Sequence, residues 1–367
     1  MARVGVITMN QVINYGSALQ TYATYVILKQ LGHDCIIIDY CYPNEFHYQH
    51  GAVKMELSWR SRIAKKFGLT VNWRMRLVLQ RFLKKNVCLS RLYKNPNELL
   101  QSPPDCDIFI SGSDQIWNPV FNYEDNSYLL AFVPDGKRRV AFSSSFSTLT
   151  LPANRSCDYK RWLSKYAAIS VREKSGICIV KNLTGKNAEC TLDPTLVLDS
   201  VYWNAFADKA NKTRSTKPYI LVYILTYAVN PWSKINSLLD ELYETTGYDV
   251  IQLGGGVLSV PHYKNIEACS PEMFVNLMRE ASIVVTSSFH GTAFALNFGK
   301  PLVAFYDEKG DDRVYSLLKE LSLESCGYEI HSEDREELSP YYDVLVEQTK
   351  LQNLRNKTIE FLTRNLY

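Results

Sequence analysis

The stretch from Val284 to Ala293 places a histidine where a strand is predicted to meet a helix. An apolar run predicts a buried strand, and a short polar turn delivers His290 before a second apolar segment, 293–298, with the pattern of a helix. In α/β sheets such helix N-termini present N–H groups and a partial positive charge, which favour an anion. The imidazole can hold an anion or carry protons. The alternative is a histidine that caps the helix or pairs inside the core.

Two further polar residues follow other predicted strands. Arg172 comes directly after the apolar run 168–171, and Asp114 follows the run 107–111 through a loop of small residues. An arginine directly after a buried strand needs an acidic partner. Arg172 therefore forms a salt bridge with a neighbouring acid, or it clamps a phosphate or carboxylate. The sequence leaves both interpretations open.

The N-terminal segment has the pattern of a βαβ unit. A strand over 4–9 runs into a polar loop, a helix then opens at Gly16 and Ser17, and the next strand covers 35–40. Asn14, Gly16 and Ser17 are expected at the ligand edge of this unit. The glycine spacing is not GxGxxG, so a dinucleotide is poorly supported. Gly16 can also be no more than a tight turn.

The alternation of strands and helices predicts an α/β protein with two Rossmann-like domains. The polar segment 208–217 lacks apolar periodicity, which is typical of a linker, so we place the domain boundary there. The N-terminal domain is then 1–207, with an excursion from the alternation at 43–104. The C-terminal domain is 218–345, and 346–367 is predicted to be a final helix.

Length and composition exclude several classes of protein. The chain has 367 residues, 46% of them hydrophobic, which is enough for two full cores. No apolar run approaches the roughly 18–20 residues of a membrane-spanning helix, and the start of the chain runs straight into a strand without a signal-peptide pattern. We therefore expect a cytoplasmic protein. The nine cysteines are scattered without zinc spacing, which predicts reduced, mostly buried thiols and no metal site.

The excursion carries an unusual charge distribution. Between Lys54 and Lys94 there are twelve Lys or Arg residues and one acid, although the net charge of the whole chain is +3. Trp73, Leu77 and Phe82 form an apolar stripe between basic residues, which predicts an amphipathic basic helix. Such helices bind anionic membrane surfaces and diphosphate headgroups. The alternative is a solvated helical face. Binding of nucleic acid is not expected, because the sequence has no known nucleic-acid-binding motif.

Five short motifs, in order along the chain, resemble those of the polysaccharide pyruvyl transferase family. The resemblance spans roughly residues 3–325. Five motifs in the right order are far less frequent by chance than any one alone. The motifs are Asn14-x-Gly16-Ser17-x-Leu19-Gln20, Gly112-Ser113-Asp114-Gln115-x-Trp117-Asn118, Val171-Arg172-Glu173, Leu192-Asp193-Pro194-Thr195 and Ser288-Phe289-His290-Gly291-Thr292.

This resemblance implies a GT-B-like fold, in which two Rossmann-like domains face a central cleft that holds the site. It also implies an activity, the transfer of pyruvate from phosphoenolpyruvate to two hydroxyls of a sugar as a cyclic ketal, with phosphoenolpyruvate as donor substrate and no metal or other cofactor. The expected acceptor is a lipid-linked or nucleotide-linked sugar of capsule, exopolysaccharide or cell-wall synthesis. Such pathways use polyprenyl diphosphate carriers, so the basic excursion predicts a peripheral contact with the inner face of the membrane.

The resemblance also implies roles for individual residues. Phosphoenolpyruvate contacts fall on Arg172, His290 and the lysine after the strand that follows Pro301, here Lys309; Lys300 and Arg313 are rivals for that contact. Phosphoenolpyruvate carries a phosphate and a carboxylate, so fixed cations near both ends fit its chemistry. His290 is a proton carrier or a phosphate ligand.

The remaining site residues come from the same motifs. Asp114 is a candidate base for a sugar hydroxyl. Asn14, Gly16, Ser17 and Gly291 are expected to line the donor site. Ser147 stands where many members of the family have glycine.

Two other functions share these features. A GT-B glycosyltransferase that uses a nucleotide sugar would have the same fold, because fold does not fix function. A non-catalytic carbohydrate-binding relative would have lost some of the motif residues. The presence of both Arg172 and His290 argues against such a loss.

Overall fold

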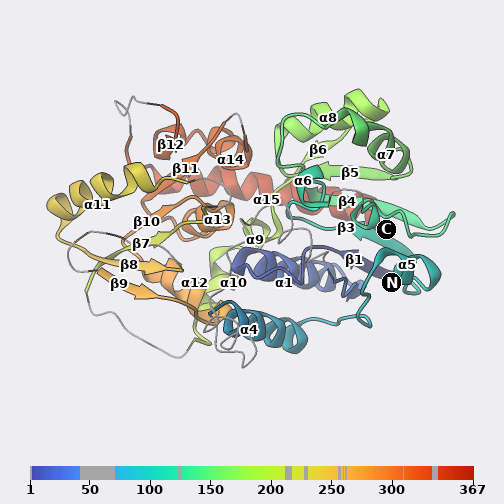
Figure 1. Cartoon of the computed structure of the whole chain (residues 1–367), viewed down its shortest axis with the longest axis horizontal. Helices are drawn as coiled ribbons and strands as arrows, with labels where there is room; N and C mark the ends of the chain where they lie inside the picture. The colour runs from blue at the N-terminus through green and yellow to red at the C-terminus, as the bar shows by residue number, and fades with distance from the viewer. Residues whose placement is uncertain are drawn as a thin grey trace, which may run out of the picture. The chain divides into compact units, whose positions relative to one another are not determined.

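A computed structural model gives the structure of the protein, and Figure 1 shows two compact units, each built around a sheet. Unit 1 comprises Met1–Val197 with Leu354–Tyr367, and unit 2 comprises Leu198–Asn353. Both chain ends belong to unit 1. The structure describes residues 2–41, 71–122, 125–210, 217–226, 230–254, 258, 260, 263–308, 310–332 and 338–367.

Unit 1 contains a six-stranded sheet in the order β2-β1-β3-β4-β5-β6, with every neighbouring pair parallel. The order turns back between β1 and β3, and such a switch point is where open α/β sheets bind ligands. The strands are β1 (Arg3–Ile7), β2 (Asp34–Ile37), β3 (Ile108–Ser111), β4 (Arg138–Ser144), β5 (Ala168–Val171) and β6 (Glu189–Cys190).

Helices connect these strands, as parallel pairing requires. The first of them, α1, joins β1 to β2, and α8 joins β5 to β6. The helical elements of unit 1 are α1 (Tyr15–Gln30), α4 (Val71–Asn86), α5 (Pro96–Gln101), α6 (Pro119–Asn122), η1 (Ser127–Leu129), α7 (Ala153–Leu163), α8 (Lys174–Thr184) and α9 (Pro194–Val197).

Unit 2 contains a second six-stranded parallel sheet, in the order β12-β11-β10-β7-β8-β9. Counted from β7, this is the 3-2-1-4-5-6 order of dinucleotide-binding folds, with its switch point between β7 and β10. The strands are β7 (Tyr219–Tyr223), β8 (Asp249–Leu253), β9 (Tyr263–Ile266), β10 (Ile283–Thr286), β11 (Leu302–Tyr306) and β12 (Gly327–Glu329). The helical elements are α10 (Ser200–Ala207), α11 (Trp232–Thr246), α12 (Pro271–Glu280), α13 (Phe289–Asn297), α14 (Arg313–Leu321), η2 (Glu324–Cys326) and α15 (Val344–Leu366).

The α/β class and the two Rossmann-like sheets are therefore confirmed, while three predicted details differ. The division falls after Val197, before the polar segment 208–217, because α10 packs within unit 2: the Trp203 ring meets the Phe294 ring at 4.9 Å between centroids. The final helix, α15, crosses the division and belongs to both units. Strands β6, β9 and β12 were not predicted, because edge strands are short and only partly apolar.

Each unit has its own core, with aromatic rings that anchor the helices. In unit 1, Trp117 lies 5.1 Å from the Phe146 ring and 5.8 Å from the Tyr166 ring, between centroids. In unit 2, Phe274 links the rings of Tyr223 and Phe294 at 5.2 and 5.8 Å. Each such ring stabilises its unit by about 1.5–3 kcal/mol through burial. These contacts join the loops after β3 and β4 in unit 1, and β7, α12 and α13 in unit 2.

Part of the basic excursion is outside the described residues, and the rest forms α4 and α5. The predicted basic helix is present as α4, but its apolar stripe is used inside the protein, since Phe82 is buried with its ring 5.4 Å from that of Tyr22 on α1. Trp73 remains exposed. Within the described part of the chain, the helices are too short or too polar to cross a membrane.

The cysteines are free, as predicted, but the expectation that most are buried was wrong. Cys35, Cys106 and Cys326 are buried, whereas four others are exposed. Burial raises the pKa of the Cys106 and Cys326 thiols to about 11, so these two stay protonated at neutral pH. The exposed thiols are Cys88, Cys157, Cys178 and Cys190.

Candidate functional site

The switch point of unit 1 brings the first two motifs together. Ser17, in the first turn of α1, donates a hydrogen bond through Oγ to Asp114 Oδ2 at 2.5 Å. Thr8, just after β1, donates through Oγ1 to the carbonyl of Ser113 at 2.8 Å. Because β1 and β3 are parallel neighbours, their carboxyl ends deliver both loops to one edge. Ser17 and Asp114 are therefore neighbours at the carboxyl edge of this sheet.

Asp114 has a strained backbone. Its φ of 81° lies in the left-handed region, which a side chain with a Cβ rarely adopts. Such residues cost about 1–3 kcal/mol and persist where the surroundings hold them. Here the Asp114 carbonyl accepts the Ser145 N–H at 3.0 Å, and Oδ1 accepts the Gln115 N–H at 2.9 Å. The hydrogen bonds from Ser17 and Gln115 fix the direction of this buried carboxylate at the carboxyl edge of the sheet.

Arg172 forms the salt bridge that the sequence left open. Its Nη1 lies 3.0 Å from Asp193 Oδ2, and its Nη2 lies 4.0 Å from Asp114 Oδ1. All three side chains are buried. Strand β5 delivers Arg172, and the chain after its parallel neighbour β6 delivers Asp193. A buried guanidinium beside two carboxylates satisfies the partner requirement and is also rigidly oriented.

Asp193 is the residue whose role the sequence analysis missed. Besides Arg172, it accepts hydrogen bonds from the Ser113 hydroxyl at 2.7 Å and from the Thr195 amide and hydroxyl at 2.9 and 2.6 Å. It therefore connects the ends of β3, β5 and β6. The sequence places Asp193 shortly after a strand, as it does Arg172. That these two strands are neighbours in the sheet depends on the strand order, which the sequence does not give.

Glu173 fixes the loop after β4. Its Oε1 accepts the amides of Phe146 and Ser147 at 2.7 and 3.2 Å, and the side chain is buried. Ser147 has a φ of 51°, in the region that favours glycine. This explains why glycine suits that position. The serine adopts the same backbone at a modest conformational cost.

Asn14 has a structural role that the sequence did not specify. It is the N-cap of α1, and its Oδ1 accepts the amides of Gly16 and Ser17 at 2.7 and 3.3 Å. The helix begins at Tyr15, so Gly16 and Ser17 lie in its first turn. A cap of this kind stabilises a helix by about 1 kcal/mol.

In unit 2, His290 lies in the first turn of α13. This helix begins at Phe289, earlier than predicted, and its N-cap is Ser288, whose Oγ accepts the Gly291 amide at 3.3 Å. His290 is therefore not the cap. It is buried, and its ring stands edge-on to Phe289 at 5.4 Å between centroids. A helix N-terminus favours negative charge near such a side chain.

Close packing accounts for Gly291. A Cβ at this position would lie 2.4 Å from Thr286 Oγ1, so only glycine allows α13 to approach the end of β10. Thr286 in turn donates to the Tyr223 carbonyl at 2.6 Å and accepts the Ser288 amide at 3.0 Å. The β7–β10 switch point thus holds the turn that presents His290.

The structure separates the three candidates for the second phosphate contact. Lys300 precedes β11, so it lies at the opposite edge of the sheet from His290, which follows the parallel strand β10. Burial lowers its pKa, which further disfavours a fixed charge. Arg313 begins α14 at the same edge as His290, and its Nε contacts both oxygens of Asp311 at 2.7 and 2.9 Å. Lys309 lies outside the described residues.

Comparison with known structures defines the class of protein. A UDP-GlcNAc 2-epimerase from Neisseria meningitidis bound to UDP-GlcNAc aligns over 100% of both chains with 12% identity and a TM-score of 0.57. The S. aureus MnaA–UDP co-structure aligns over 97% of each chain with 10% identity and a TM-score of 0.52. At such identities the likeness shows the fold alone. The protein is a two-domain α/β protein with a GT-B-like fold.

The family follows from the sequence. The model of the polysaccharide pyruvyl transferase family matches residues 14–308, which is more than half of the chain. This protein belongs to that family and is a transferase by membership. A comparison with curated proteins found no match. The resemblance drawn from five motifs is therefore confirmed, while the roles of individual residues stay predictions.

We predict that Asp193→Asn destabilises unit 1 by about 3–5 kcal/mol, because it removes the charge that compensates a buried guanidinium. The matched control is Glu280→Gln. Glu280 pairs with Arg279 at the same 3.0 Å, but its side chain is 58% exposed and Arg279 also pairs with Asp208, so its loss should cost less than about 1 kcal/mol. Urea unfolding followed by tryptophan fluorescence measures both. Equally small losses in the free energy of unfolding for both variants would show that the Asp193–Arg172 pair stabilises the fold no more than the control pair does.

Proposed function

We propose that this protein transfers pyruvate from phosphoenolpyruvate to two hydroxyls of a sugar as a cyclic ketal. The observation that carries this proposal is the convergence of Ser17, Asp114, Arg172 and Asp193, from four family motifs, into one buried hydrogen-bonded network at the carboxyl edge of one sheet. The fifth motif supplies His290 at a helix N-terminus.

The reaction needs one proton at carbon and one at phosphate. The methylene carbon of phosphoenolpyruvate takes a proton, the first sugar hydroxyl adds to the central carbon, the bond to phosphate breaks, and the second hydroxyl adds. The two sugar hydroxyls release two protons. One replaces the proton that the methylene carbon takes up to become a methyl group, and the other leaves with inorganic phosphate. The protein must therefore accept protons from hydroxyls, deliver one to carbon, and hold an anion.

The charges of the two sites support a division of these tasks. The edge of unit 1 carries Asp114, Asp193 and Glu173 against Arg172, so it favours hydroxyl donors, and Asp114 is our candidate for the hydroxyl base. The N-terminus of α13 favours an anion, and His290 is our candidate for proton delivery or phosphate binding. Asp193 holds one edge of the Arg172 guanidinium, which orients this proposed phosphoenolpyruvate contact. That the two domains face one central cleft stays a prediction.

The direct test is phosphate release. With phosphoenolpyruvate and a panel of lipid-linked or nucleotide-linked sugars, we expect phosphate to appear only when a suitable acceptor is present. Phosphoenolpyruvate alone should raise the melting temperature, because a ligand that binds the folded state stabilises it. Stabilisation by a nucleotide sugar and not by phosphoenolpyruvate would favour the glycosyltransferase alternative. Binding without turnover of any acceptor would favour the non-catalytic relative.

His290→Gln separates the two roles of the histidine. Glutamine keeps a hydrogen-bond donor but cannot carry a proton, so a proton carrier would lose roughly 10²–10⁴ in kcat with phosphoenolpyruvate affinity kept. A phosphate ligand would instead lose affinity, and His290→Ala should abolish turnover in both cases. Near-normal turnover by both His290 variants would make this motif structural.

We further propose that the basic helix α4 docks the enzyme on an anionic membrane surface, where a lipid-linked acceptor would lie. Since Phe82 packs on α1, the attraction depends on the exposed charges of α4, each contributing about 1 kcal/mol near such a surface. These charges are Arg74, Arg81, Lys84 and Lys85.

Replacing these four residues by glutamine should reduce sedimentation with anionic vesicles at low salt and spare phosphoenolpyruvate affinity. The binding of the unchanged protein should weaken as salt rises, because the Debye length falls. An equal number of glutamine substitutions at exposed lysines elsewhere is the matched control, which should sediment like the unchanged protein: Lys160, Lys181, Lys209 and Lys319. Equal sedimentation of both variants would remove the membrane proposal.

A further inference from the structure

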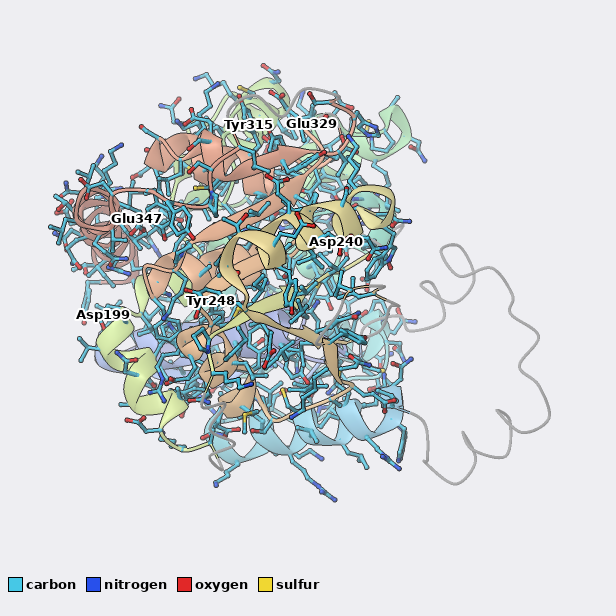
Figure 2. All side chains as sticks on the ribbon, turned by 90° about the vertical axis from the view of Figure 1, so that its left-hand side faces the viewer. Asp199, Asp240, Tyr248, Tyr315, Glu329 and Glu347 are labelled. Carbon is cyan, nitrogen blue, oxygen red and sulfur yellow. The ribbon has the colours of Figure 1, made fainter. Side chains whose placement is uncertain are left out.

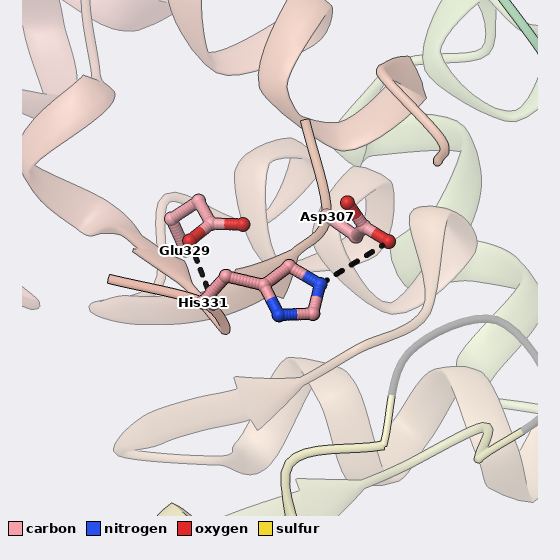
Figure 3. A group of neighbouring side chains, drawn as sticks. All are labelled: Asp307, Glu329 and His331. Atoms are coloured by element: carbon pink, nitrogen blue, oxygen red, sulfur yellow. Dashed lines mark hydrogen bonds and ion pairs between the residues drawn. The ribbon is translucent and has the colours of Figure 1, made fainter. Parts of the chain in front are cut away.

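Three side chains that are scattered in sequence meet at the carboxyl edge of the sheet in unit 2. Asp307 directly follows β11, Glu329 ends β12, and His331 comes two residues later. The strands pair in parallel with Tyr306 opposite Glu329, so the pairing register itself brings the two carboxylates to one edge. Figure 3 shows the three side chains turned toward one another. Their candidate ligand atoms lie within 4.8 Å of one another.

Backbone donors orient both carboxylates. The Gly310 amide donates to Asp307 Oδ1 at 3.0 Å, and Oδ2 faces His331 Nε2 at 3.6 Å. The His331 amide donates to Glu329 Oε2 at 2.6 Å, and the Ile330 amide binds the Tyr306 carbonyl at 3.1 Å. The loop between Asp307 and Asp311 closes by backbone pairing. One oxygen of each carboxylate is therefore held by the backbone, which presets the position of the other.

Gly310 packs closely against the Asp307 carboxylate. A Cβ on Gly310 would lie 2.5 Å from Asp307 Oδ2, the oxygen that faces His331. The glycine therefore lets this carboxylate keep the position in which it faces the imidazole.

The spacing and charge match a divalent cation. Ligand atoms bound to one metal ion at about 2.0–2.2 Å lie about 3.0–3.6 Å apart, and the observed 3.6 Å between the Asp307 and His331 atoms is at the upper end of that range. Asp307 and Glu329 both place a carboxylate here, so a cation would meet negative charge. Lys234 donates to the Ser332 carbonyl, in the residue after His331.

We propose that Asp307, Glu329 and His331 bind a divalent transition-metal cation that ties the edge strand β12 to β11. One imidazole with two carboxylates suits Mn²⁺, Fe²⁺, Co²⁺ or Zn²⁺, whereas Ca²⁺ and Mg²⁺ prefer oxygen ligands throughout. This inference does not rest on the pyruvyl transfer proposed above. The sequence analysis predicted no metal because it searched for local ligand spacing, and this set is assembled only by strand pairing.

Manganese is the probe of choice, because the four exposed thiols would compete for Zn²⁺. After treatment with a chelator, the full chain should bind one Mn²⁺, seen as loss of the free-ion electron paramagnetic resonance signal. Pulsed measurements should show nitrogen coupling from the imidazole. Mn²⁺ should also raise the melting temperature.

His331→Gln should remove the nitrogen coupling, and both His331→Gln and Asp307→Asn should weaken Mn²⁺ binding by at least about tenfold. The matched control is Asp240→Asn, an exposed aspartate on α11 that Figure 2 labels together with Glu329. It should bind Mn²⁺ like the unchanged protein. The His331 side chain is 62% exposed, so its variant should melt like the unchanged protein in the absence of metal, which separates lost binding from lost folding.

Either of two results would overturn the proposal. One is Mn²⁺ binding that is the same in the unchanged protein, Asp307→Asn and His331→Gln. The other is an unchanged protein that neither binds Mn²⁺ nor gains stability from it. Gly310→Ala gives a further check, since a methyl group against Asp307 Oδ2 should weaken Mn²⁺ binding without removing a ligand.

Discussion

Parallel pairing between neighbouring strands is the constraint on which the rest of this structure depends. Parallel strands all start at one edge of the sheet, so the chain must cross a face of the sheet between one strand and the next. The carboxyl ends of all the strands therefore lie at the opposite edge. In unit 1 this brings the loops after β1, β3, β5 and β6 together, although their residues lie far apart in sequence. In unit 2 the same rule joins the ends of β7 and β10 around Ser287, whose Oγ accepts the Leu225 amide at 2.8 Å.

Electrostatics at the unit 1 edge follow from that geometry. Three buried carboxylates and one guanidinium would be costly if they were unpaired, since a buried charge without a partner costs several kcal/mol. Backbone amides, hydroxyls and Arg172 supply the partners, and Asp193 collects four of these bonds. The positive φ of Asp114 and Ser147 lies at the same edge. Strain and buried charge gathered at one sheet edge are typical of a functional site.

The helix α4, in the excursion between β2 and β3, has a packed side and a charged side. Phe82 joins the core through Tyr22, which anchors α4 to α1. Its basic residues then remain on the outside, because an amphipathic helix that buries one face must expose the other. Phe82 of the apolar stripe therefore belongs to folding, whereas Trp73 is exposed beside the basic residues.

The sequence by itself determined the α/β class, the two-sheet organisation and the family, because strand and helix periods and the five motifs are local patterns. It also located His290 at the start of a helix and Asp114 at a strand end. Tertiary structure alone decided that Asp193 is the partner of Arg172, that Lys300 lies at the wrong edge, and that Asp307 meets His331. The physical reason is that such contacts depend on strand order and register, which arise from the packing of whole sheets and not from the spacing of residues along the chain.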